Sequence, residues 1–182
     1  MSDGSTLTTY LELITPPVGK PLASPLARTT VTRQRFTAES YLPLYGAVGS
    51  PLGWDGRTLI TRQALEDLLA APSMDIYVLT VDGSPAGFCE FNRTQPPDSE
   101  LKYFGLVPVM QGRKLGPYLL DVALRLHWRL TEPRRIWLHT DTWDDPKAIS
   151  VYERSGFRVF AEHMLSETAD DKDYKAAIGI VM

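Results

Sequence analysis

The sequence of 182 residues contains a single cysteine, Cys89, so no disulfide can form within the chain. One isolated thiol is typical of a protein from a reducing compartment. Histidine is also scarce. His127, His139 and His163 lie far apart and lack the spacing of metal ligands, so we expect no metal site.

Long apolar runs are missing too. No segment approaches the roughly 20 apolar residues that cross a membrane. The first residues, MSDGSTLTTYLEL, lack the basic segment and the apolar core of a secretion signal. We therefore expect a cytoplasmic protein that has no membrane partner.

The sequence has no large excess of charge of either sign. Its 19 Lys and Arg against 22 Asp and Glu give a formal net charge of −3, and the isoelectric point is about 5.6. This balance provides no overall attraction to nucleic acid or to an anionic membrane surface. A small molecule is the expected partner.

The composition is that of an ordinary globular domain, with 43% hydrophobic and 23% charged residues. The length suits one domain with a sizeable core. We divide the chain into an N-terminal strand and a Pro-rich linker, residues 1–27, and a single domain, residues 28–182. No internal repeat is visible.

The N-terminal third combines strand and helix patterns. Segments 6–13 and 28–36 alternate polar and apolar residues and are rich in threonine, which predicts two strands that form a pair. Short helices are expected at about 38–47 and 61–71. The glycines and the proline of the loop between them leave Trp54 in a position to line a pocket.

The rest of the chain predicts an antiparallel meander, a helix, a strand, a short helix and a final pair of strands. The DGS between the first two meander strands is a strong hairpin signal. A strand that follows a strand and a helix usually runs parallel to the first. These elements are expected at 76–81, 85–91, 100–107, 116–130, 135–142 and 144–155, and in FRVFAEHML and YKAAIGIVM. The predicted fold class is α/β (α+β by some schemes), with a mixed sheet of about six or seven strands, about four flanking helices and an extra N-terminal strand.

The turn VPVMQGRKLGPYLL joins strand 100–107 to the next helix. It carries Gly112, Arg113, Lys114 and Gly116, and Pro117 stands in the first helical turn. Ligands of α/β sheets bind at the carboxyl ends of strands, where helix N-termini offer free N–H groups. The turn therefore predicts an anion site, and a plain connection is the alternative. It is neither a Walker loop nor a GxGxxG loop.

The segment DDPKAISVYERSGFRVF predicts a helix of about three turns. Asp145 is the expected N-cap, Pro146 takes the first helical position, and Gly156 ends the helix. Ala148 and Tyr152 are four residues apart and share a face, so the small side chain leaves a groove beside the ring. Packing in the core is the simpler explanation of the tyrosine.

Together these two segments resemble the acetyl-coenzyme A-dependent N-acetyltransferases of the GNAT superfamily, over about residues 28–182. In that family the turn reads Gln or Arg, two residues, Gly, one residue, then Gly or Ala. Gln111 and Gly116 match, whereas Lys114 replaces the first glycine. The second motif reads Asn, two residues, Ala, three residues, Tyr, three residues and Gly-Phe. Its positions hold Asp145, Ala148, Tyr152, Gly156 and Phe157.

The resemblance implies a GNAT-like fold and transfer of an acetyl group from acetyl-CoA to a primary amine, with no metal. The loop that holds Trp54 is expected to wall the acceptor, which we expect to be a small molecule. A homodimer is compatible with it. Cofactor contacts are implied for Leu106, Val107, Gln111, Gly112, Arg113, Lys114, Leu115, Gly116, Asp145 and Ala148. Lys114 either fills space beside the pyrophosphate or stays in a right-handed conformation and turns its ammonium toward the phosphates. Lys147 is read as part of a solvated surface.

The resemblance also implies the catalytic groups. The Tyr152 hydroxyl is expected near the cofactor sulfur, where it can protonate the leaving thiolate. Glu100 lies eleven residues before Gln111, the spacing of the glutamate base in the histone-modifying branch of the family. Other candidates for the base are Glu90, His139, Asp141 and a water chain. A binding module of the same fold that holds acyl-CoA without chemistry is the alternative function.

Overall fold

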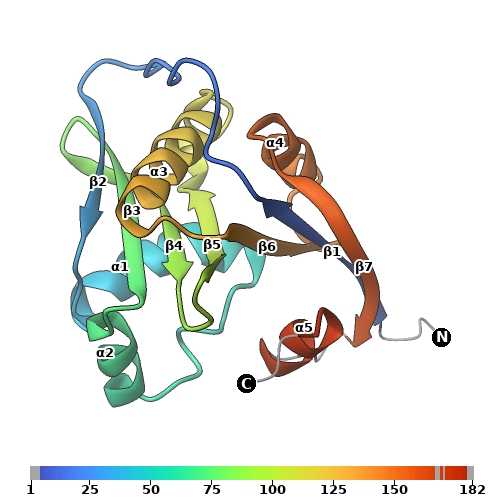
Figure 1. Cartoon of the computed structure of the whole chain (residues 1–182). Helices are drawn as coiled ribbons and strands as arrows, with labels where there is room; N and C mark the ends of the chain where they lie inside the picture. The colour runs from blue at the N-terminus through green and yellow to red at the C-terminus, as the bar shows by residue number, and fades with distance from the viewer. Residues whose placement is uncertain (1–4, 167–168, 170, 180–182) are drawn as a thin grey trace.

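The computed structural model describes residues 5–166, 169 and 171–179. These residues form one seven-stranded sheet with the strand order β2-β3-β4-β5-β6-β1-β7, together with five α-helices (Figure 1). The strands are β1 (Ser5–Leu13), β2 (Thr29–Gln34), β3 (Met74–Val81), β4 (Ser84–Asn92), β5 (Asp98–Leu106), β6 (Arg135–Asp141) and β7 (Arg158–Ser166). The helices are α1 (Ala38–Gly49), α2 (Arg62–Ala70), α3 (Leu115–Thr131), α4 (Ala148–Arg154) and α5 (Asp171–Ala177). The predicted mixed sheet flanked by helices is confirmed.

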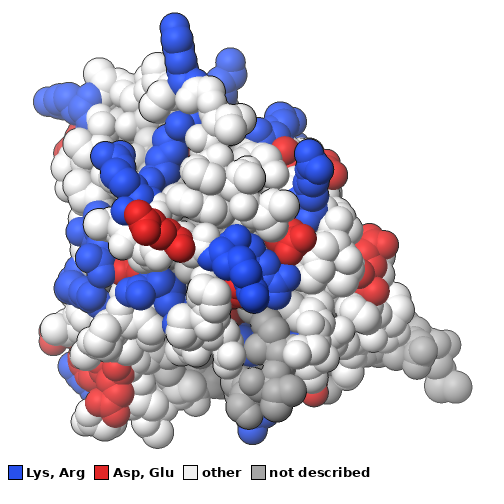
Figure 2. Space-filling view, viewed as in Figure 1, with Lys and Arg blue, Asp and Glu red and all other residues white. Residues whose placement is uncertain are grey.

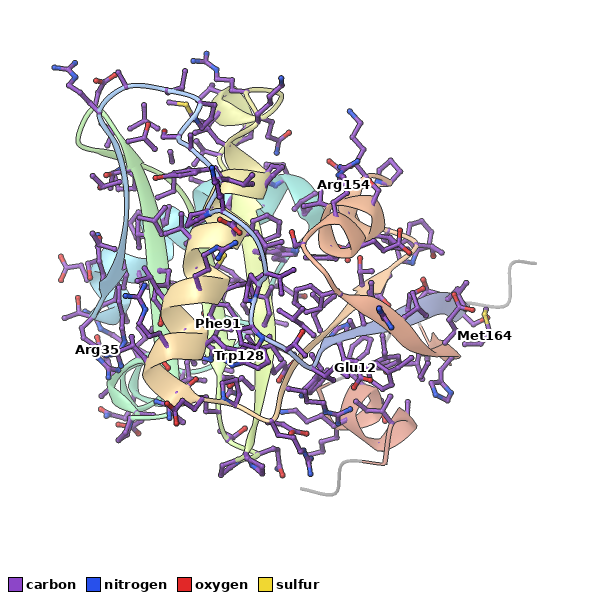
Figure 3. The ribbon with its side chains drawn as sticks, turned by 45° about the horizontal axis from the view of Figure 1, so that its top comes forward. Glu12, Arg35, Phe91, Trp128, Arg154 and Met164 are labelled. Atoms are coloured by element: carbon purple, nitrogen blue, oxygen red, sulfur yellow. The ribbon has the colours of Figure 1, made fainter. Side chains whose placement is uncertain are left out.

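Helices cover both faces of the sheet, as the alternation of side chains along β4 demonstrates. Phe91 belongs to the core under α3, and Figure 3 shows it beside Trp128 of that helix. Phe88 points to the other face, where its ring meets Tyr41 of α1. We call these the α3 face and the α1 face.

The two N-terminal strands do not pair with each other, so that prediction is wrong. β1 runs antiparallel to both β6 and β7, whereas β2 pairs with β3 at the opposite edge. The link of residues 14–28 spans the distance by crossing α3 (Figure 1). Arg125 of α3 donates to the carbonyls of Pro17 and Val18, and Asp121 accepts from the Leu22 amide. Alternation predicts a strand, but it does not name the partner strand.

The predicted meander of β3, β4 and β5 is confirmed. Asp82 and Gly83, between β3 and β4, both have positive φ angles, 50° and 82°, which is the conformation of a tight hairpin turn that matches the twist of the strands. The parallel pairing of β5 with β6 is also confirmed.

The C-terminal segment YKAAIGIVM was predicted as a strand, and this is wrong for its described part. Tyr174 to Ala177 belong to α5, and residues 180–182 lie outside the described residues. β1 already occupies the place between β6 and β7, so no strand is needed there. The helix instead docks through Tyr174, whose carbonyl accepts from the Tyr10 hydroxyl at 2.8 Å.

Helix α4 is shorter than predicted, at seven residues, and its N-cap is Lys147 rather than Asp145. Asp145 organises the preceding turn, because its side chain accepts from the Lys147 amide and its carbonyl from the Ala148 amide. Gly156 ends the helix as predicted, with a φ of +98°. Among the helices that the structure describes, none combines the length and apolar character that crossing a membrane requires.

Candidate active site

Strands β5 and β6 separate soon after they meet. Their parallel pairing covers only three residue pairs and ends where Glu100 lies opposite Trp137. Beyond this point β5 continues against β4, and β6 continues against β1. We call the separation between the backbones of residues 101–106 and 138–141 the wedge, and Glu100 lies at its apex.

A β-bulge in β5 coincides with the start of the wedge. Tyr103 lies opposite Glu90 and Leu101 lies opposite Phe91, so Lys102 is an extra residue on the β5 side. Such a bulge bends its strand and increases its twist. The bend explains why β5 leaves β6 here.

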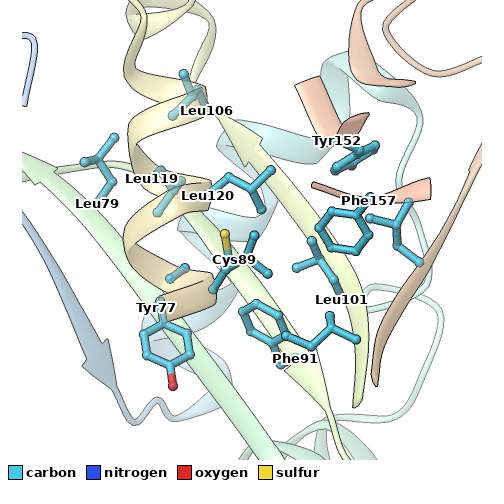
Figure 4. Packing of buried hydrophobic residues seen from close by; sticks show 14 of the residues in the cluster. Tyr77, Leu79, Cys89, Phe91, Leu101, Leu106, Leu119, Leu120, Tyr152 and Phe157 are labelled. Atoms are coloured by element: carbon cyan, nitrogen blue, oxygen red, sulfur yellow. The ribbon is translucent and has the colours of Figure 1, made fainter. Parts of the chain in front are cut away.

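Tyr152 of α4 faces the wedge from the α3 face. Its ring centroid lies 5.9 Å from that of Phe104 on β5 and 5.9 Å from that of Phe157. In Figure 4, Phe157 lies beside Leu101, and Tyr152 lies above Phe157. The tyrosine is 9% exposed, and no hydrogen bond joins its hydroxyl to another described residue. Tyr152 therefore packs in the core, as the simpler explanation holds, and also borders the wedge.

The Tyr152 hydroxyl is suited to give a proton rather than to take one. Burial raises the pKa of this phenol well above its ordinary value, and the nearby Asp144 and Cys89 raise it further. A phenolate would lose its hydration in this position and would meet negative charge. The phenol therefore stays protonated at neutral pH, and the same raised pKa makes it a weaker acid than an exposed tyrosine.

The turn before α3 has the features of an anion site. Residues 111–114 are exposed, the first turn of α3 contains no acidic residue, and no side chain caps its N-terminus. Two cations, Arg113 and Lys114, stand beside these amides. Of the residues implied for the cofactor, Gln111, Gly112, Arg113, Lys114, Leu115 and Gly116 all belong to this turn or to the start of the helix.

Lys114 is left-handed, with φ 60° and ψ 14°, so the expectation of a right-handed lysine is wrong. The resembling family has glycine at this position, and glycine adopts this conformation without steric cost. The chain therefore keeps the backbone path and adds an exposed ammonium to it. The strain of a side chain in this region is about 1 kcal/mol.

Leu106 and Val107 differ in the direction of their backbone groups. The Val107 amide donates to the Ala86 carbonyl at 2.9 Å, on the side of β4. Backbone groups of successive strand residues point to opposite sides, so those of Leu106 point toward the wedge. The Leu106 carbonyl accepts a long hydrogen bond of 3.4 Å from the Gln111 side chain.

These features fit the parts of acetyl-CoA. The phosphates need positive charge and free amides, which the start of α3 offers, and the pantetheine arm needs a strand whose backbone is unpaired, which the wedge offers. Ala148 of α4 is half-buried and packs against the same core as Tyr152. Asp145 is exposed and lies before the helix. Within the described residues, no group of three or more His, Cys, Asp or Glu could hold a metal ion.

Glu100 lies on the α1 face of β5, so it reaches the wedge from the side opposite Tyr152. Its carboxylate is 4% exposed. Lys102 Nζ lies 3.3 Å from Oε1, and Lys175 Nζ of α5 lies 3.7 Å from Oε2. Oε1 makes no hydrogen bond. Glu100 lies opposite Asn92 and Phe104 lies opposite Cys89 on β4, about 10 Å apart along the strand, so the structure places the two predicted catalytic groups at different depths of one wedge.

The other candidate bases are engaged elsewhere. Glu90 is fully buried, accepts from the Tyr41 hydroxyl and pairs with Arg57. The Arg57 guanidinium in turn lies 5.1 Å from the ring centroid of Tyr103. Both carboxylate oxygens of Glu90 are thus engaged, one by Tyr41 and the other by Arg57.

His139 and Asp141 meet at Tyr174 of α5 rather than at each other. The imidazole stacks on the Tyr174 ring at 4.1 Å, and the Tyr174 hydroxyl donates to Asp141 at 3.1 Å. Burial raises the pKa of Asp141, although the hydrogen bonds from Thr8 and Tyr174 oppose this. Both residues thus help to dock α5.

Sequence reasoning missed Arg57 and Lys175. Arg57 lies in a glycine-rich loop and Lys175 in a segment read as a strand, and neither belongs to a motif. A charged residue that becomes buried through a contact with a distant strand leaves no local signal. Only the long-range partner, Glu90 or Glu100, reveals it.

Comparison with known proteins agrees with this geometry. The model of the acetyltransferase (GNAT) family matches residues 44–157, which is more than half of the chain. No curated protein matches the sequence.

Several solved structures share the fold at low sequence identity. A tandem GNAT protein from the clavulanic acid biosynthesis pathway has a TM-score of 0.64 at 16% identity, over 93% of this chain and 56% of that protein. A GCN5-related N-acetyltransferase from Sphaerobacter thermophilus has a TM-score of 0.60 at 18% identity, over 88% and 50%. An aminoglycoside acetyltransferase from an uncultured soil metagenomic sample has a TM-score of 0.58 at 12% identity, over 71% and 88%. The chain thus spans between half and two thirds of the length of several of these proteins, including 63% of one from Staphylococcus epidermidis.

Proposed function

Because the chain belongs to the GNAT family of acetyltransferases, we propose that it transfers an acetyl group from acetyl-CoA directly to a primary amine of a small molecule. The observation that carries the proposal is the wedge, which opens between Glu100 and the exposed N-terminus of α3 and is bordered by Tyr152. A strand that is unpaired on one side, a helix N-terminus and a buried phenol are the three features that this transfer needs.

The start of α3 would hold the phosphates. Its amides and the cations of Arg113 and Lys114 provide positive charge where no acidic side chain opposes it. The Leu106 backbone and the groove beside Ala148 would hold the pantetheine arm. Gly112 has nothing within 4 Å of the position that a Cβ would take, so the space at the turn is open.

Tyr152 would act as the general acid. Bound acetyl-CoA supplies a thioester, whose cleavage releases a thiolate that benefits from a proton. The Tyr152 hydroxyl is protonated and makes no hydrogen bond to the described residues, so its proton is available for such a donation.

Glu100 would act as the base for the acceptor amine. On the α1 face Lys175 of α5 lies beside this carboxylate, so an acceptor amine would have to take the place of the Lys175 side chain. Oε1 makes no hydrogen bond. The ammonium of Lys102, two residues along the strand, lies 3.3 Å from Oε1.

The acceptor site would be walled by the loop after α1. Trp54 contacts the rings of Tyr45 and Tyr103 at centroid distances of 5.9 and 4.9 Å. An aromatic wall of this kind suits an alkyl amine, whose cation it attracts. On the face of the molecule seen in Figure 2, Lys and Arg are interspersed with uncharged and acidic side chains. This pattern favours a small acceptor over a polyanion.

Two measurements test the proposal. Acetyl-CoA should raise the melting temperature, because a ligand that binds only the native state stabilises it, by about 2.7 kcal/mol at a hundred times the Kd. A thiol-release assay over alkyl amines, polyamines, amino acids and aminoglycosides should then identify an acceptor. The absence of a thermal shift at millimolar acetyl-CoA would contradict the proposal. Binding without thiol release on any of these amines would favour the non-catalytic module.

A further inference from the structure

Helix α5 covers the α1 face of the sheet next to the apex of the wedge. Its Tyr174 contacts Tyr10, His139 and Asp141, all on β1 or β6. Its next residue, Lys175, is only 3% exposed. The side of the wedge from which an acceptor amine would approach Glu100 is therefore occupied by a segment of the same chain.

Lys175 brings a primary amine to the candidate base. Its Nζ lies 3.7 Å from Glu100 Oε2. Asn92, Asp98 and Trp137 line the same recess, in which no water-sized space is left. Lysine is rarely buried to this degree unless it is paired, and here its partner is the residue that would deprotonate an acceptor.

We propose that Lys175 is an internal acetyl acceptor, so that the chain acetylates its own Nζ when acetyl-CoA is bound. This inference rests on the proposed function. The inference identifies Lys175 as one acceptor amine. Helix α5 would then be a substrate of the site that the helix covers.

The transfer is balanced without any further reagent. The Lys175 ammonium gives one proton to Glu100, and the neutral Nζ attacks the thioester carbon of acetyl-CoA. The new N–C bond forms as the C–S bond breaks, and the thiolate takes a proton from Tyr152. The amine loses a second proton as it becomes an amide; this proton restores the Tyr152 hydroxyl, and Glu100 releases its own proton to solvent. The products are acetyl-lysine, free coenzyme A and one proton released to solvent.

The step requires Nζ to move from Glu100 toward Tyr152 along part of the roughly 10 Å that separates Glu100 from the level of Phe104. Helix α5 has seven residues and is held through Tyr174, so a shift of the helix would break the hydrogen bonds that Tyr174 makes with Tyr10 and Asp141. Glu100 does not lose all of its compensating charge in this movement, because Lys102 stays 3.3 Å from its other oxygen.

Burial allows a clean experiment. Bulk acetyl-CoA modifies exposed lysines chemically, and Lys172, on the same helix, is exposed, whereas Lys175 is not. The full-length protein, with its starting mass verified, is incubated with acetyl-CoA, and acetylated sites are followed by intact mass and peptide mapping. We expect one acetyl group at Lys175, formed at least ten times faster than at Lys172. Its rate constant should not depend on protein concentration, because the reaction occurs within one chain.

Variants separate catalysis from background. Tyr152→Phe and Glu100→Gln should each slow acetylation of Lys175 at least tenfold and leave Lys172 unchanged, whereas Lys172→Arg should not alter Lys175. Glu100→Gln removes the partner of Lys175 and could detach α5. Tyr152→Phe keeps the ring and the fold, so in that case it alone tests whether acetylation of Lys175 is catalysed.

Three results would overturn the inference. The first is acetylation of Lys102 or Lys172 in place of Lys175. The second is acetylation of Lys175 in Tyr152→Phe at the wild-type rate, and the third is a rate constant that rises with protein concentration. Its failure can be told from failure of the proposed function in the same samples. A thermal shift with acetyl-CoA and acetylation of external amines, but an unmodified Lys175, would reject only the internal acceptor. The absence of any thermal shift would reject both.

Discussion

The ring of Tyr152 lies 5.9 Å from the ring of Phe104, on the stretch of β5 that has already separated from β6. A residue of α4 thus packs against β5 where this strand pairs with β4 on one side and has no partner on the other. Removal of the hydroxyl alone distinguishes a chemical role from packing, because the ring contacts stay.

Tyr152→Phe should lower kcat about ten- to a hundredfold with little change in the affinity for acetyl-CoA, since protonation of the thiolate belongs to the transition state. Thiol release and isothermal titration measure the two quantities. Tyr77→Phe is the matched control, because Tyr77 is also buried and its hydroxyl has no hydrogen-bond partner. Equal kcat values for Tyr152→Phe and wild type, with chemistry rate-limiting, would leave Tyr152 as a packing residue.

The pH profile gives a second test of Tyr152. Burial raises its pKa above the ordinary value near 10, so the group stays a proton donor as the pH rises. We therefore expect no loss of rate from this residue up to about pH 10. A loss of rate below pH 9 that is seen in wild type and absent from Tyr152→Phe would contradict this expectation, because it would show that the phenol ionises in that range.

Glu100→Gln should lower turnover at least about a hundredfold and abolish the acidic limb of the rate profile, because an amide cannot take the proton of the amine. Cofactor affinity should be kept, as Glu100 is far from the start of α3. Glu12→Gln serves as the control, since Glu12 is a partly buried carboxylate paired with Arg135 on a neighbouring strand. An acidic limb that survives in Glu100→Gln would move the role of base to water or another group.

Lys114→Gly should raise the free energy of unfolding by up to about 1 kcal/mol, because it relieves the left-handed conformation. Lys114→Glu should weaken acetyl-CoA binding more than Lys114→Gly does, and salt should reduce the difference. Glu132→Gly is the matched control: Glu132 is also left-handed, at the other end of α3, with a φ of +43°. Glu132→Gly should gain similar stability without any change in the affinity for acetyl-CoA. Equal affinities of the two Lys114 variants would show that the ammonium does not meet the phosphates.

His127 predicts a loss of stability in mild acid. Burial lowers its pKa to about 4, although Asp75 opposes the shift. Between about pH 6.5 and 4 the unfolded chain therefore binds a proton that the native protein does not, so stability falls as the pH falls. From pH 7.5 to 5 the loss is about 2 kcal/mol. Urea titrations of wild type and His127→Gln at both pH values measure it, and the same pH dependence in both proteins would contradict the assignment.

The sequence by itself determined most of the local structure. Alternation located the strands of the meander, the DGS turn located their hairpin, and helical spacing located α3, because these signals depend on neighbours within a few residues. Gly156 stopped α4 for the same reason. The motif at residues 111–116 located the exposed, uncapped start of α3 that we propose as the anion site.

The tertiary structure alone decided how distant segments meet. β1 lies between β6 and β7, and the link that follows it crosses α3, where Arg125 and Asp121 bind its backbone; no local pattern encodes that path. The bulge at Lys102 and the wedge beyond Glu100 result from the registers of three strands. Tyr174 and Lys175 hold α5 as a helix on the α1 face through contacts with residues up to 164 positions away. The ion pair between Lys175 and Glu100 is therefore a property of the assembled sheet. The two residues are distant in the sequence and come together, away from water, only when the protein folds.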